Sequence, residues 1–324
     1  MTKTSVAVIG AGFVGGSLAQ VLVERGLTVY NYDKAGKCAV GAEKAQIRYF
    51  PDCSGAPDYR NVENIRELVE SCSPKEGFSG IYFVCLPTPM ESNGKADLSI
   101  VEGVLNELAN TNVNLIAVVK STVPPGSVEG WNKRFAATNL RIVFSPEFLR
   151  EATALEDMRN QDRIILGGPR PYINTVKQLF EQAFPNVHII KTSSSTAEMV
   201  KYITNIHLAV KCSLANEFYQ ICNALDAQGA NIDYDKCIEY ATLDERLGQS
   251  HWKVPGPMLS DDTHMPVAGW AGSCFIKDLN ALMHVSRELG IDPKVMSGAW
   301  EKNLEVRPQK DWFKLVGRAV SEKK

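Results

Sequence analysis

The chain has 324 residues, of which 44% are hydrophobic and 22% charged; 35 Lys and Arg against 37 Asp and Glu give a formal net charge of −2. At about 150 residues per domain this length predicts two domains. The composition is typical of a globular protein and excludes a disordered chain, a collagen-like repeat and a disulfide-stapled miniprotein. The near-neutral charge provides no general basic surface, so we expect neither nucleic acid nor an anionic membrane as a partner.

Short apolar runs alternate with helical patterns in the first half of the chain. The runs are Ser5–Ile9, Leu27–Tyr32, Ile81–Leu86, Leu115–Val119, Arg141–Phe144 and Ile164–Leu166. Helical patterns between them include Val14–Arg25, Val62–Ser71 and Leu98–Ala109. Continuous apolar strands separated by helices are typical of a parallel sheet covered on both faces. With right-handed crossovers, this pattern predicts a doubly wound α/β fold of the Rossmann type.

The pattern changes to helices alone near residue 194. One helical pattern without Gly or Pro runs from Thr196 to about Ala227. The later helical patterns are Tyr234–Thr242, Phe275–Leu289 and Pro293–Asn303. We therefore predict a sheet domain over residues 1–193 and an all-helical domain over residues 194–324, which one long helix connects.

An irregular stretch rich in Pro, Gly and Asp covers residues 248–269 of the second domain. Connections of this length are usually functional or mobile. It could be a substrate lid that uses Trp252 and Trp270 as stacking surfaces, or a simple surface excursion, and the sequence does not choose between them.

A glycine-rich motif, GAGFVG at residues 10–15, follows the first apolar run and opens a helical pattern. Its three glycines suit a tight turn, a close approach of the backbone to a pyrophosphate, and close packing of the helix on the strand. Asp33 ends the next strand 18 residues after Gly15, where a carboxylate can bind both ribose hydroxyls. The motif predicts NAD rather than NADP, although Lys34 and Lys37 nearby weaken that preference.

Eight cysteines are present, but none of them forms a CxxC pair, so no metal site is expected. The start lacks the pattern of a signal peptide, and no apolar run is long enough to span a membrane. We expect a cytoplasmic protein whose thiols are mostly reduced and whose cysteines other than Cys274 are buried.

Cys274 has a chemical setting that the other cysteines lack. It lies near the start of a predicted helix, just after Gly272, and it shares a helix face with Asp278. The helix dipole and Lys277 favour a thiolate there. A thiolate can attack an aldehyde to give a thiohemiacetal. Hydride transfer from that adduct then gives a thioester, which water hydrolyses.

Three segments together strongly resemble the UDP-glucose/GDP-mannose dehydrogenase family: KSTVPPG at residues 120–126, SPEFLREA at 145–152 and GSCFIKDL at 272–279. The resemblance covers residues 1 to about 305. Members of this family oxidise the C6 alcohol of a nucleotide sugar to a carboxylate and use two NAD per turnover. The resemblance therefore implies an NAD-dependent nucleotide-sugar 6-dehydrogenase, and UDP-glucose is the substrate that we expect.

The resemblance also implies a set of site residues. The catalytic ones are the nucleophile Cys274, the active-site pair Lys201 and Asn205, Asp278 as the partner of Lys201 in proton handling, Glu147 on the hydrolytic water, and Thr122 beside the nicotinamide. The cofactor contacts are Gly10, Gly12, Phe13, Val14, Gly15, Asp33, Lys37, Pro87, Thr88, Thr122, Glu151 and Lys277. The substrate contacts are Phe148, Leu149, Arg150, Glu151, Lys201, Asn205, Arg246, Gly272 and Cys274. From spacing alone, Lys201 and Asn205 would be a solvated helix face.

Arg246 lies in a segment that resembles the family's Asp-x-Arg-Ile-Gly pattern. In the family this arginine reaches the substrate of the partner subunit, which implies a homodimer formed mainly through the long helix. Its guanidinium suits a phosphate or a sugar oxygen.

The chain departs from the family pattern in three places. The spacing from Arg246 to Cys274 is wider than usual, Ala271 and Ile276 replace a Gly and a Pro, and the family's third domain is expected to be missing. A partner protein, the inserted loop or residues 305–324 could replace that domain, or the substrate could be smaller. Two other functions stay open: a two-electron dehydrogenase of the β-hydroxyacid type, which needs no cysteine, and a non-catalytic NAD-binding subunit.

Overall fold

The computed structural model describes residues 5–35, 39–43, 46–49, 59–72, 80–256 and 266–322. The described strands are β1 (Ser5–Ile9), β2 (Thr28–Tyr32), β3 (Ala39–Glu43), β4 (Gln46–Tyr49), β5 (Tyr59–Asn61), β6 (Gly80–Val84), β7 (Leu115–Val119), β8 (Leu140–Phe144), β9 (Arg163–Gly167) and β10 (His188–Thr192). The α-helices are α1 (Phe13–Glu24), α2 (Ile65–Cys72), α3 (Ser99–Ala109), α4 (Ser127–Arg134), α5 (Ala154–Arg159), α6 (Arg170–Ala183), α7 (Ser194–Ala227), α8 (Tyr234–Ala241), α9 (Cys274–Glu288) and α10 (Lys294–Val306). Short 3-10 turns are η1 (Glu151–Thr153), η2 (Glu245–Leu247) and η3 (Asp311–Lys314).

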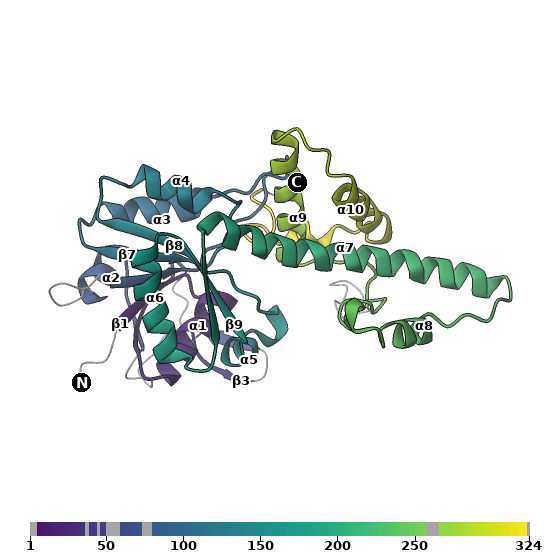
Figure 1. Cartoon of the computed structure of the whole chain (residues 1–324), viewed down its shortest axis with the longest axis horizontal. Helices are drawn as coiled ribbons and strands as arrows, with labels where there is room; N and C mark the ends of the chain where they lie inside the picture. The colour runs from purple at the N-terminus through teal and green to yellow at the C-terminus, as the bar shows by residue number, and fades with distance from the viewer. Residues whose placement is uncertain are drawn as a thin grey trace. The chain divides into compact units, whose positions relative to one another are not determined.

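The chain forms two compact units (Figure 1). The first comprises residues 1–88 and 98–201, and the second comprises residues 89–97 and 202–324. The sequence prediction placed the division at residue 194, where α7 begins. The compact units divide within α7, and the short segment 89–97 between β6 and α3 joins the second unit.

The first unit is built on one sheet with the strand order β10-β9-β8-β7-β6-β1-β2-β5. Neighbouring strands are parallel, except that β9 is antiparallel to β8 through Phe144 and Gly167. The predicted Rossmann-type sheet is confirmed. The sequence pattern missed this antiparallel pair and strand β10, whose residues are largely exposed and therefore give no continuous apolar run.

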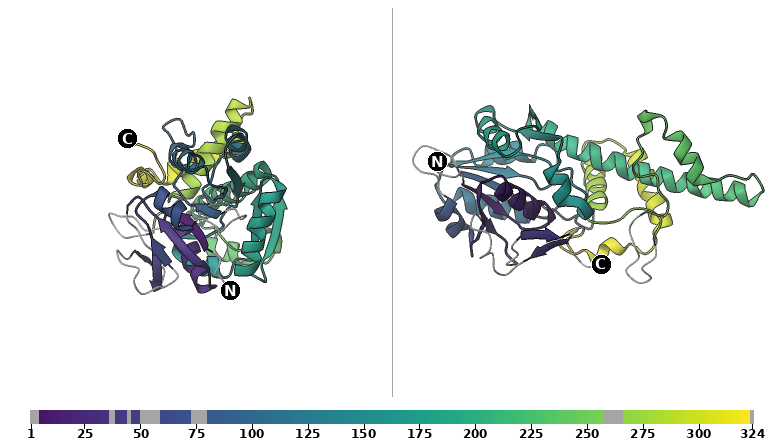
Figure 2. Two further views of the ribbon diagram at one scale, coloured as in Figure 1. Left: turned by 90° about the vertical axis from the view of Figure 1, so that its left-hand side faces the viewer. Right: turned by 90° about the horizontal axis from the view of Figure 1, so that it is seen from below.

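Both faces of the sheet are covered, as doubly wound folds require. Alternate residues of β1, such as Ala7 and Val8, belong to two different buried clusters. One cluster holds residues of α2, α3 and α4, and the other holds residues of α1, α5 and α6. Figure 2 shows helices on both faces of the sheet. This period of two along buried strands explains why they are apolar on both faces.

The second unit is helical, and its parts are distant in sequence. It contains the later part of α7 together with α8, α9 and α10. Its last described residues pair with the 89–97 segment, because the N–H of Met90 donates to the carbonyl of Ala319 over 2.9 Å and the N–H of Ser321 donates to the carbonyl of Met90 over 2.9 Å. Within the described residues, no helix is both long and apolar enough to cross a membrane.

Candidate active site

Packing requires glycine at positions 10 and 15 of the 10–15 motif, whereas the space beside Gly12 is empty. Gly10 has φ +93°, and a Cβ there would lie 2.4 Å from the carbonyl oxygen of Cys85. A Cβ on Gly15 would lie 1.9 Å from the carbonyl oxygen of Gly10. A Cβ on Gly12 would meet nothing within 4 Å, and no side chain caps the helix α1 that begins after it. This turn therefore leaves room for a pyrophosphate at the start of α1, and half-buried Phe13 and Val14 form the first helical residues.

Asp33 lies directly after β2 and is tied to the glycine turn. Its Oδ2 accepts a hydrogen bond from the N–H of Ala11 over 2.8 Å, and its Oδ1 accepts one from the N–H of Ala35 over 2.9 Å. The carboxylate is thus held at the end of β2 beside the turn, where it fits the ribose of NAD. Contact with the ribose stays a prediction, and Lys37 lies outside the described residues.

The ends of β6 and β7 are joined by side-chain hydrogen bonds. The Thr88 hydroxyl, which follows Pro87, donates to the carbonyl of Thr122 over 2.7 Å. The Ser121 hydroxyl accepts from the N–H of Leu86 over 2.9 Å. These residues lie at the carboxyl ends of the strands, which is where open α/β sheets bind ligands.

A buried ion pair joins Glu147, which follows β8, to Lys201 of α7. The Lys201 ammonium donates to Glu147 Oε1 over 2.9 Å and to the Glu147 carbonyl over 2.6 Å. The other carboxylate oxygen, Oε2, accepts from the N–H of Leu149 over 2.6 Å. Burial alone would raise the pKa of Glu147, but the charge and hydrogen bond of Lys201, the Leu149 amide and the charge of Lys120 together lower it. Glu147 is therefore held as a carboxylate in a fixed orientation.

A second buried lysine, Lys120, lies at the end of β7 in the same cluster. Its ammonium donates to the carbonyl of Ser145 over 3.1 Å, to the Ser145 hydroxyl over 3.4 Å and to the carbonyl of Pro146 over 3.4 Å. Burial lowers the pKa of Lys120, and the charge of Lys201 lowers it further, whereas Cys85 and Glu147 oppose that shift. Sequence reasoning included Lys120 in a motif but gave it no role, because its burial and its acceptors are tertiary properties.

The residues after Glu147 lie at or near the surface of the first unit. The Phe148 ring has the guanidinium of Arg163 4.5 Å from its centroid and the ammonium of Lys201 5.7 Å from it. Leu149 is half-buried, whereas Arg150 and Glu151 are exposed. Arg150 binds Asp157 with two hydrogen bonds of 3.1 and 2.6 Å, which raises the pKa of Arg150. The predicted substrate and cofactor contacts of this segment are thus accessible on one short loop.

In the second unit, Cys274 is the first residue of α9. Gly272, with φ +80°, makes the turn into the helix, and the Ser273 hydroxyl oxygen lies 3.9 Å from the Cys274 sulfur. No side chain caps this helix at Ser273. The thiol is therefore placed at the positive end of the helix dipole, as the sequence predicted.

Asp278 is buried one helical turn beyond Cys274 and is bound by two side chains. The Asn205 amide of α7 donates to Asp278 Oδ2 over 2.6 Å, and the Lys277 ammonium lies 2.5 Å from Oδ1. A carboxylate with an amide on one oxygen and an ammonium on the other is held in a single orientation. The structure thus gathers four predicted residues of the second unit around the start of α9: Asn205, Cys274, Lys277 and Asp278.

Arg246 lies in η2 and is exposed, with its guanidinium bonded to Asp244 over 2.9 and 2.5 Å. The next residues are anchored from α7, because the Lys211 ammonium donates to the carbonyls of Leu247 and Gly248 over 2.8 and 2.9 Å. Lys211 also lies 4.7 Å from the Trp252 ring centroid. The Arg246 side chain is thus exposed on a turn whose following residues are held by Lys211.

Trp252 and Trp270, which the sequence offered as stacking surfaces of a lid, are 8% and 3% exposed, so the burial of both rings speaks against that alternative. Each packs within the second unit, where Trp252 lies against Lys211 and Trp270 lies against Phe275. Part of the 248–269 stretch lies outside the described residues, and the choice between a lid and a surface excursion stays open. Cys237 is exposed rather than buried, because it lies on the solvent side of α8.

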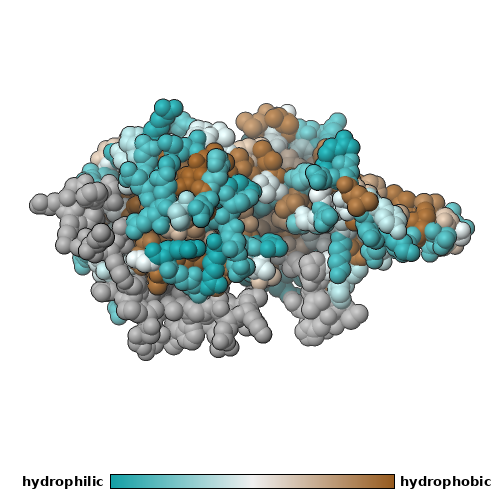
Figure 3. All heavy atoms as spheres, turned by 60° about the horizontal axis from the view of Figure 1, so that its bottom comes forward, coloured by the Kyte–Doolittle hydropathy of each residue, from teal (hydrophilic) through white to brown (hydrophobic). Residues whose placement is uncertain are grey.

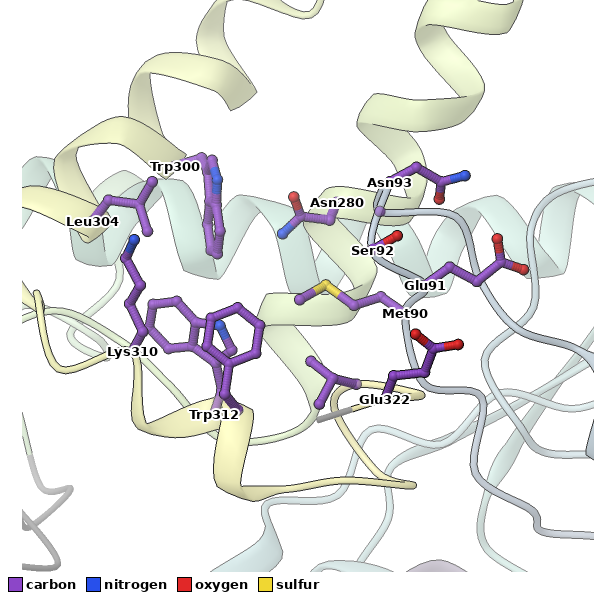
Figure 4. Close-up of a pocket in the computed structure, with 13 residues that line it drawn as sticks. Met90, Glu91, Ser92, Asn93, Asn280, Trp300, Leu304, Lys310, Trp312 and Glu322 are labelled. Atoms are coloured by element: carbon purple, nitrogen blue, oxygen red, sulfur yellow. The ribbon is translucent and has the colours of Figure 1, made fainter. Parts of the chain in front are cut away.

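A cavity of about 280 Å³ lies elsewhere in the second unit (Figure 4). Its walls combine apolar and polar side chains. The apolar ones are Met90, Trp300, Leu304, Trp312, Phe313 and Val320, and the polar ones are Glu91, Ser92, Asn93, Asn280, Lys310 and Glu322. None of the predicted catalytic residues lines it. The described residues contain no cluster of three His, Cys, Asp or Glu side chains that could hold a metal ion.

Sequence reasoning missed a group of buried polar residues around these sites. They are Lys120, Glu198, Lys211, Ser213, Asn216, Asn303 and Arg307. The only available signal was a charged or amide residue on the apolar side of a helical pattern, which a single sequence does not separate from an exposed one.

The chain is similar to known dehydrogenases over most of its length. Residues 4–184 match the NAD-binding domain of the UDP-glucose/GDP-mannose dehydrogenase family, and residues 195–305 match its central domain. A UDP-glucose 6-dehydrogenase of Haloferax volcanii is 29% identical in an alignment of 340 positions, gaps included, which covers 98% of this chain and 74% of the relative. One of Bacillus subtilis is 28% identical over 311 residues, which cover 93% of this chain and 63% of the relative.

Solved structures extend the likeness. A UDP-glucose dehydrogenase from Pyrobaculum islandicum has a TM-score of 0.76 at 26% identity, covering 94% of this chain and 68% of that one. A 3-hydroxyisobutyrate dehydrogenase of Mycobacterium tuberculosis has a TM-score of 0.65 at 16% identity, covering 93% and 92%, and this likeness concerns the fold alone. With both of its family domains matched, the chain belongs to the UDP-glucose/GDP-mannose dehydrogenase family.

Proposed function

We propose that this protein is an NAD-dependent nucleotide-sugar 6-dehydrogenase that oxidises a C6 alcohol to a carboxylate, with UDP-glucose as the first substrate to test. The observation that carries the proposal is the position of Cys274 as the first residue of α9, with Asp278 one turn later bound by Asn205 and Lys277. A two-electron dehydrogenase has no use for a thiol in this setting.

The 10–15 turn and Asp33 would hold NAD, which would supply the hydride acceptor for both oxidation steps. In the first oxidation the alcohol loses its hydroxyl proton and becomes an aldehyde. Lys201 and Asn205 donate hydrogen bonds that stabilise the developing alkoxide, and Asp278 fixes the amide of Asn205. The same donors serve the oxyanion that forms in the next step.

Cys274 then adds to the aldehyde carbon, so that a C–S bond forms and the carbonyl oxygen becomes the hydroxyl of a thiohemiacetal. Loss of that hydroxyl proton and of the second hydride gives a thioester. Glu147, held as a carboxylate by Lys201 and the Leu149 amide, positions the water that cleaves the C–S bond. The sum consumes one alcohol, one water and two NAD⁺, and it releases one carboxylate, two NADH and three protons.

The test is NADH formation with UDP-glucose, GDP-mannose and UDP-N-acetylmannosamine, with the product identified by mass spectrometry. We expect two NADH per sugar, and we expect Cys274→Ala to abolish carboxylate formation. Cys237→Ala is the matched control, because it removes an exposed thiol remote in sequence from α9. If no nucleotide sugar is oxidised, the proposal is wrong.

A two-electron reaction of the β-hydroxyacid type is the second candidate, and the fold shared with the 3-hydroxyisobutyrate dehydrogenase over 93% of this chain favours keeping it. It would give one NADH per molecule of a hydroxy acid, and Cys274→Ala would leave that rate unchanged. Cys274, Asp278 and Lys277 would then have no chemical role.

A homodimer through α7 is part of the same proposal. Leu214, Phe218, Ile221 and Leu225 are each between 41% and 48% exposed. Their spacing of four, three and four residues gives one apolar stripe of the kind that packs helix against helix, and apolar atoms gather at this end of the molecule (Figure 3).

Light scattering tests this interface. We expect the wild type to have the mass of a dimer and Phe218→Asp to have the mass of a monomer, while Tyr240→Asp in α8 serves as an exposed aromatic control. A monomeric wild type would contradict the proposal. Arg246 would lose its role if the dimer does not form.

A further inference from the structure

Asn303, near the end of α10, makes two hydrogen bonds to the backbone of a single residue. The N–H of Trp270 donates to Asn303 Oδ1 over 2.8 Å, and Asn303 Nδ2 donates to the carbonyl of Trp270 over 3.0 Å. The Asn303 side chain is fully buried. This arrangement copies the paired bonds of two β-strands and sets the orientation of the peptide groups on both sides of Trp270.

The two residues before Trp270 are held in the same way. The N–H of Gly269 donates to Asn216 Oδ1 of α7 over 3.1 Å, and the Arg307 guanidinium donates to the carbonyl of Ala268 over 3.2 Å. Arg307 is itself fully buried and is fixed by Asp311 over 2.8 and 2.5 Å. Buried side chains from α7, from α10 and from Arg307 directly after α10 thus bind the backbone of three consecutive residues.

The fit is close at Gly269. Its φ is +74°, and a Cβ there would lie 2.6 Å from Asn303 Oδ1. Only glycine satisfies both the left-handed backbone and the approach of the amide. The loop is therefore shaped around Asn303, and a larger residue at 269 would displace either the loop or α10.

This held segment leads straight into the nucleophile. Three residues separate Trp270 from Cys274, and Gly272 makes the turn between them with φ +80°. The Trp270 ring also packs edge to face on Phe275, the residue after Cys274, with the ring centroids 6.4 Å apart. The start of α9 is thus fixed on both sides of the thiol.

A buried amide costs more desolvation than a leucine of similar size, and leucine could fill the same space. What leucine cannot do is bind the N–H and C=O of Trp270. An asparagine at this position therefore indicates that holding the backbone of Trp270 matters more than filling the space. Such holding matters for a reaction, because a displacement near 1 Å at a reacting centre costs about a hundredfold in rate.

We propose that Asn303 is a positioning residue for Cys274, which acts by holding the backbone of Trp270 so that the thiol meets the aldehyde carbon. This inference rests on the proposed function. It also separates the two halves of the reaction, because Asn303 affects the steps that use the thiol and not the first hydride transfer. Arg307 and Asn216 support the same loop.

The first experiment measures each half of the reaction in Asn303→Leu and Asn303→Asp. We expect the first hydride transfer, seen as a single-turnover burst of NADH, to stay within about twofold of wild type. We expect carboxylate formation to fall about tenfold or more, with NADH per sugar dropping from two toward one and the aldehyde recovered as an oxime with hydroxylamine. Asn303→Asp keeps the acceptor for the Trp270 N–H, so we expect it to lose less than Asn303→Leu.

Ser213→Ala is the matched control. The Ser213 hydroxyl accepts from the Trp270 ring N–H over 2.8 Å and donates to the carbonyl of Ala299 over 2.7 Å, so its loss leaves the backbone bonds of Trp270 intact. We expect Ser213→Ala to lower the melting temperature but to keep two NADH per sugar. If Asn303→Leu slows both halves equally, or if Ser213→Ala gives the same aldehyde release, Asn303 is merely structural and the proposal is overturned.

A second measurement needs no turnover and therefore separates this proposal from the proposed function. The rate at which iodoacetamide alkylates Cys274 is followed by peptide mass spectrometry on the folded, NAD-loaded protein. We expect Asn303→Leu to be at least about fivefold slower than Ser213→Ala, because Sγ leaves the amides at the start of α9. Equal rates overturn the positioning role even if wild type oxidises a nucleotide sugar, whereas a slower rate supports it even if no substrate is found.

Discussion

The two units hold their polar residues in different ways. In the first unit, Glu147 lies among two buried lysines, so the cluster has more cationic than anionic groups. In the second, Asp278 is matched by one lysine and one amide beside the thiol. An excess of positive charge stabilises an oxyanion, whereas a carboxylate matched by one ammonium adds no net charge beside the Cys274 thiol. Under the function proposed above, the first cluster suits the oxyanion and water steps and the second suits the thiol steps.

The largest effect is expected from Lys201→Met, which breaks the buried ion pair with Glu147. Removing one partner of such a pair costs about 3–5 kcal/mol of stability, and removing an oxyanion donor costs about 10²–10³ in kcat. Because Lys201 lowers the pKa of Glu147, the pair's contribution to stability is present above about pH 4.5 and is lost as pH falls below it. The variant lacks the pair, so we expect this acid-dependent loss of stability to be smaller in it than in wild type.

Denaturant titrations from about pH 2.5 to 7 measure this change in stability, and single-turnover kinetics near neutral pH measure the change in rate. Lys177→Met is the control, since it removes an exposed partner of Glu181 on α6. If Lys201→Met is as stable and as active as wild type, the ion pair of Lys201 and Glu147 has no role in stability or catalysis.

Asn205→Leu tests the second unit's cluster. It removes the 2.6 Å hydrogen bond to Asp278 and leaves that carboxylate with Lys277. We expect kcat to fall about 10²-fold, with a loss of stability of about 1–3 kcal/mol, less than for Lys201→Met. Asn205→Asp should be worse for stability, because it places two carboxylates together. A rise in KM with unchanged kcat would show that Asn205 binds substrate without acting on the transition state.

Glu198 gives a pH test of the first unit that is independent of catalysis. Its carboxylate accepts from the N–H groups of Gly126 and Val128 over 2.6 and 2.9 Å, and burial raises its pKa to about 7. The folded state therefore holds a proton that the unfolded state releases above about pH 4.5, so this group's contribution to stability falls as pH rises toward 7. The change is about 3 kcal/mol as an upper figure. We expect the melting temperature of wild type, relative to Glu198→Gln, to fall between pH 5 and 8, and a constant difference would refute it.

Lys120→Met should have the smallest effect and sharpens the charge argument. The methionine fills the same space without a charge, so stability should change by less than about 1 kcal/mol. Because Lys120 lowers the pKa of Glu147, its removal should move the acid limb of kcat/KM to higher pH. Ser145→Ala removes only the 3.4 Å contact of the Lys120 ammonium and should leave the limb in place. If the acid limb of kcat/KM lies at the same pH in wild type, Lys120→Met and Ser145→Ala, the charge of Lys120 does not set the pKa that controls this limb.

Local patterns predicted much of this molecule because their physics is local. The turn at Gly10 and the start of α9 beside Cys274 follow from a glycine next to a helical period, and both elements are found there. Strand β10 was missed because Ile190 and its neighbours are exposed at the sheet's edge. Asn303 was read only as the end of a helix, since its partner Trp270 is 33 residues away in sequence.

The segment 89–97 decides when the second unit can close during synthesis. Met90 and Asp97 leave the ribosome early, but their partners Ala319 and Ser321 follow more than two hundred residues later. At about 5–20 residues per second, the segment waits on the order of ten to fifty seconds for them. The first unit can fold while the chain is still being made, whereas the second is completed only after residues 319–321 have been made. A nascent chain stalled before residue 319 would therefore carry a finished sheet and an open helical unit, which is the form that chaperones and proteases would meet.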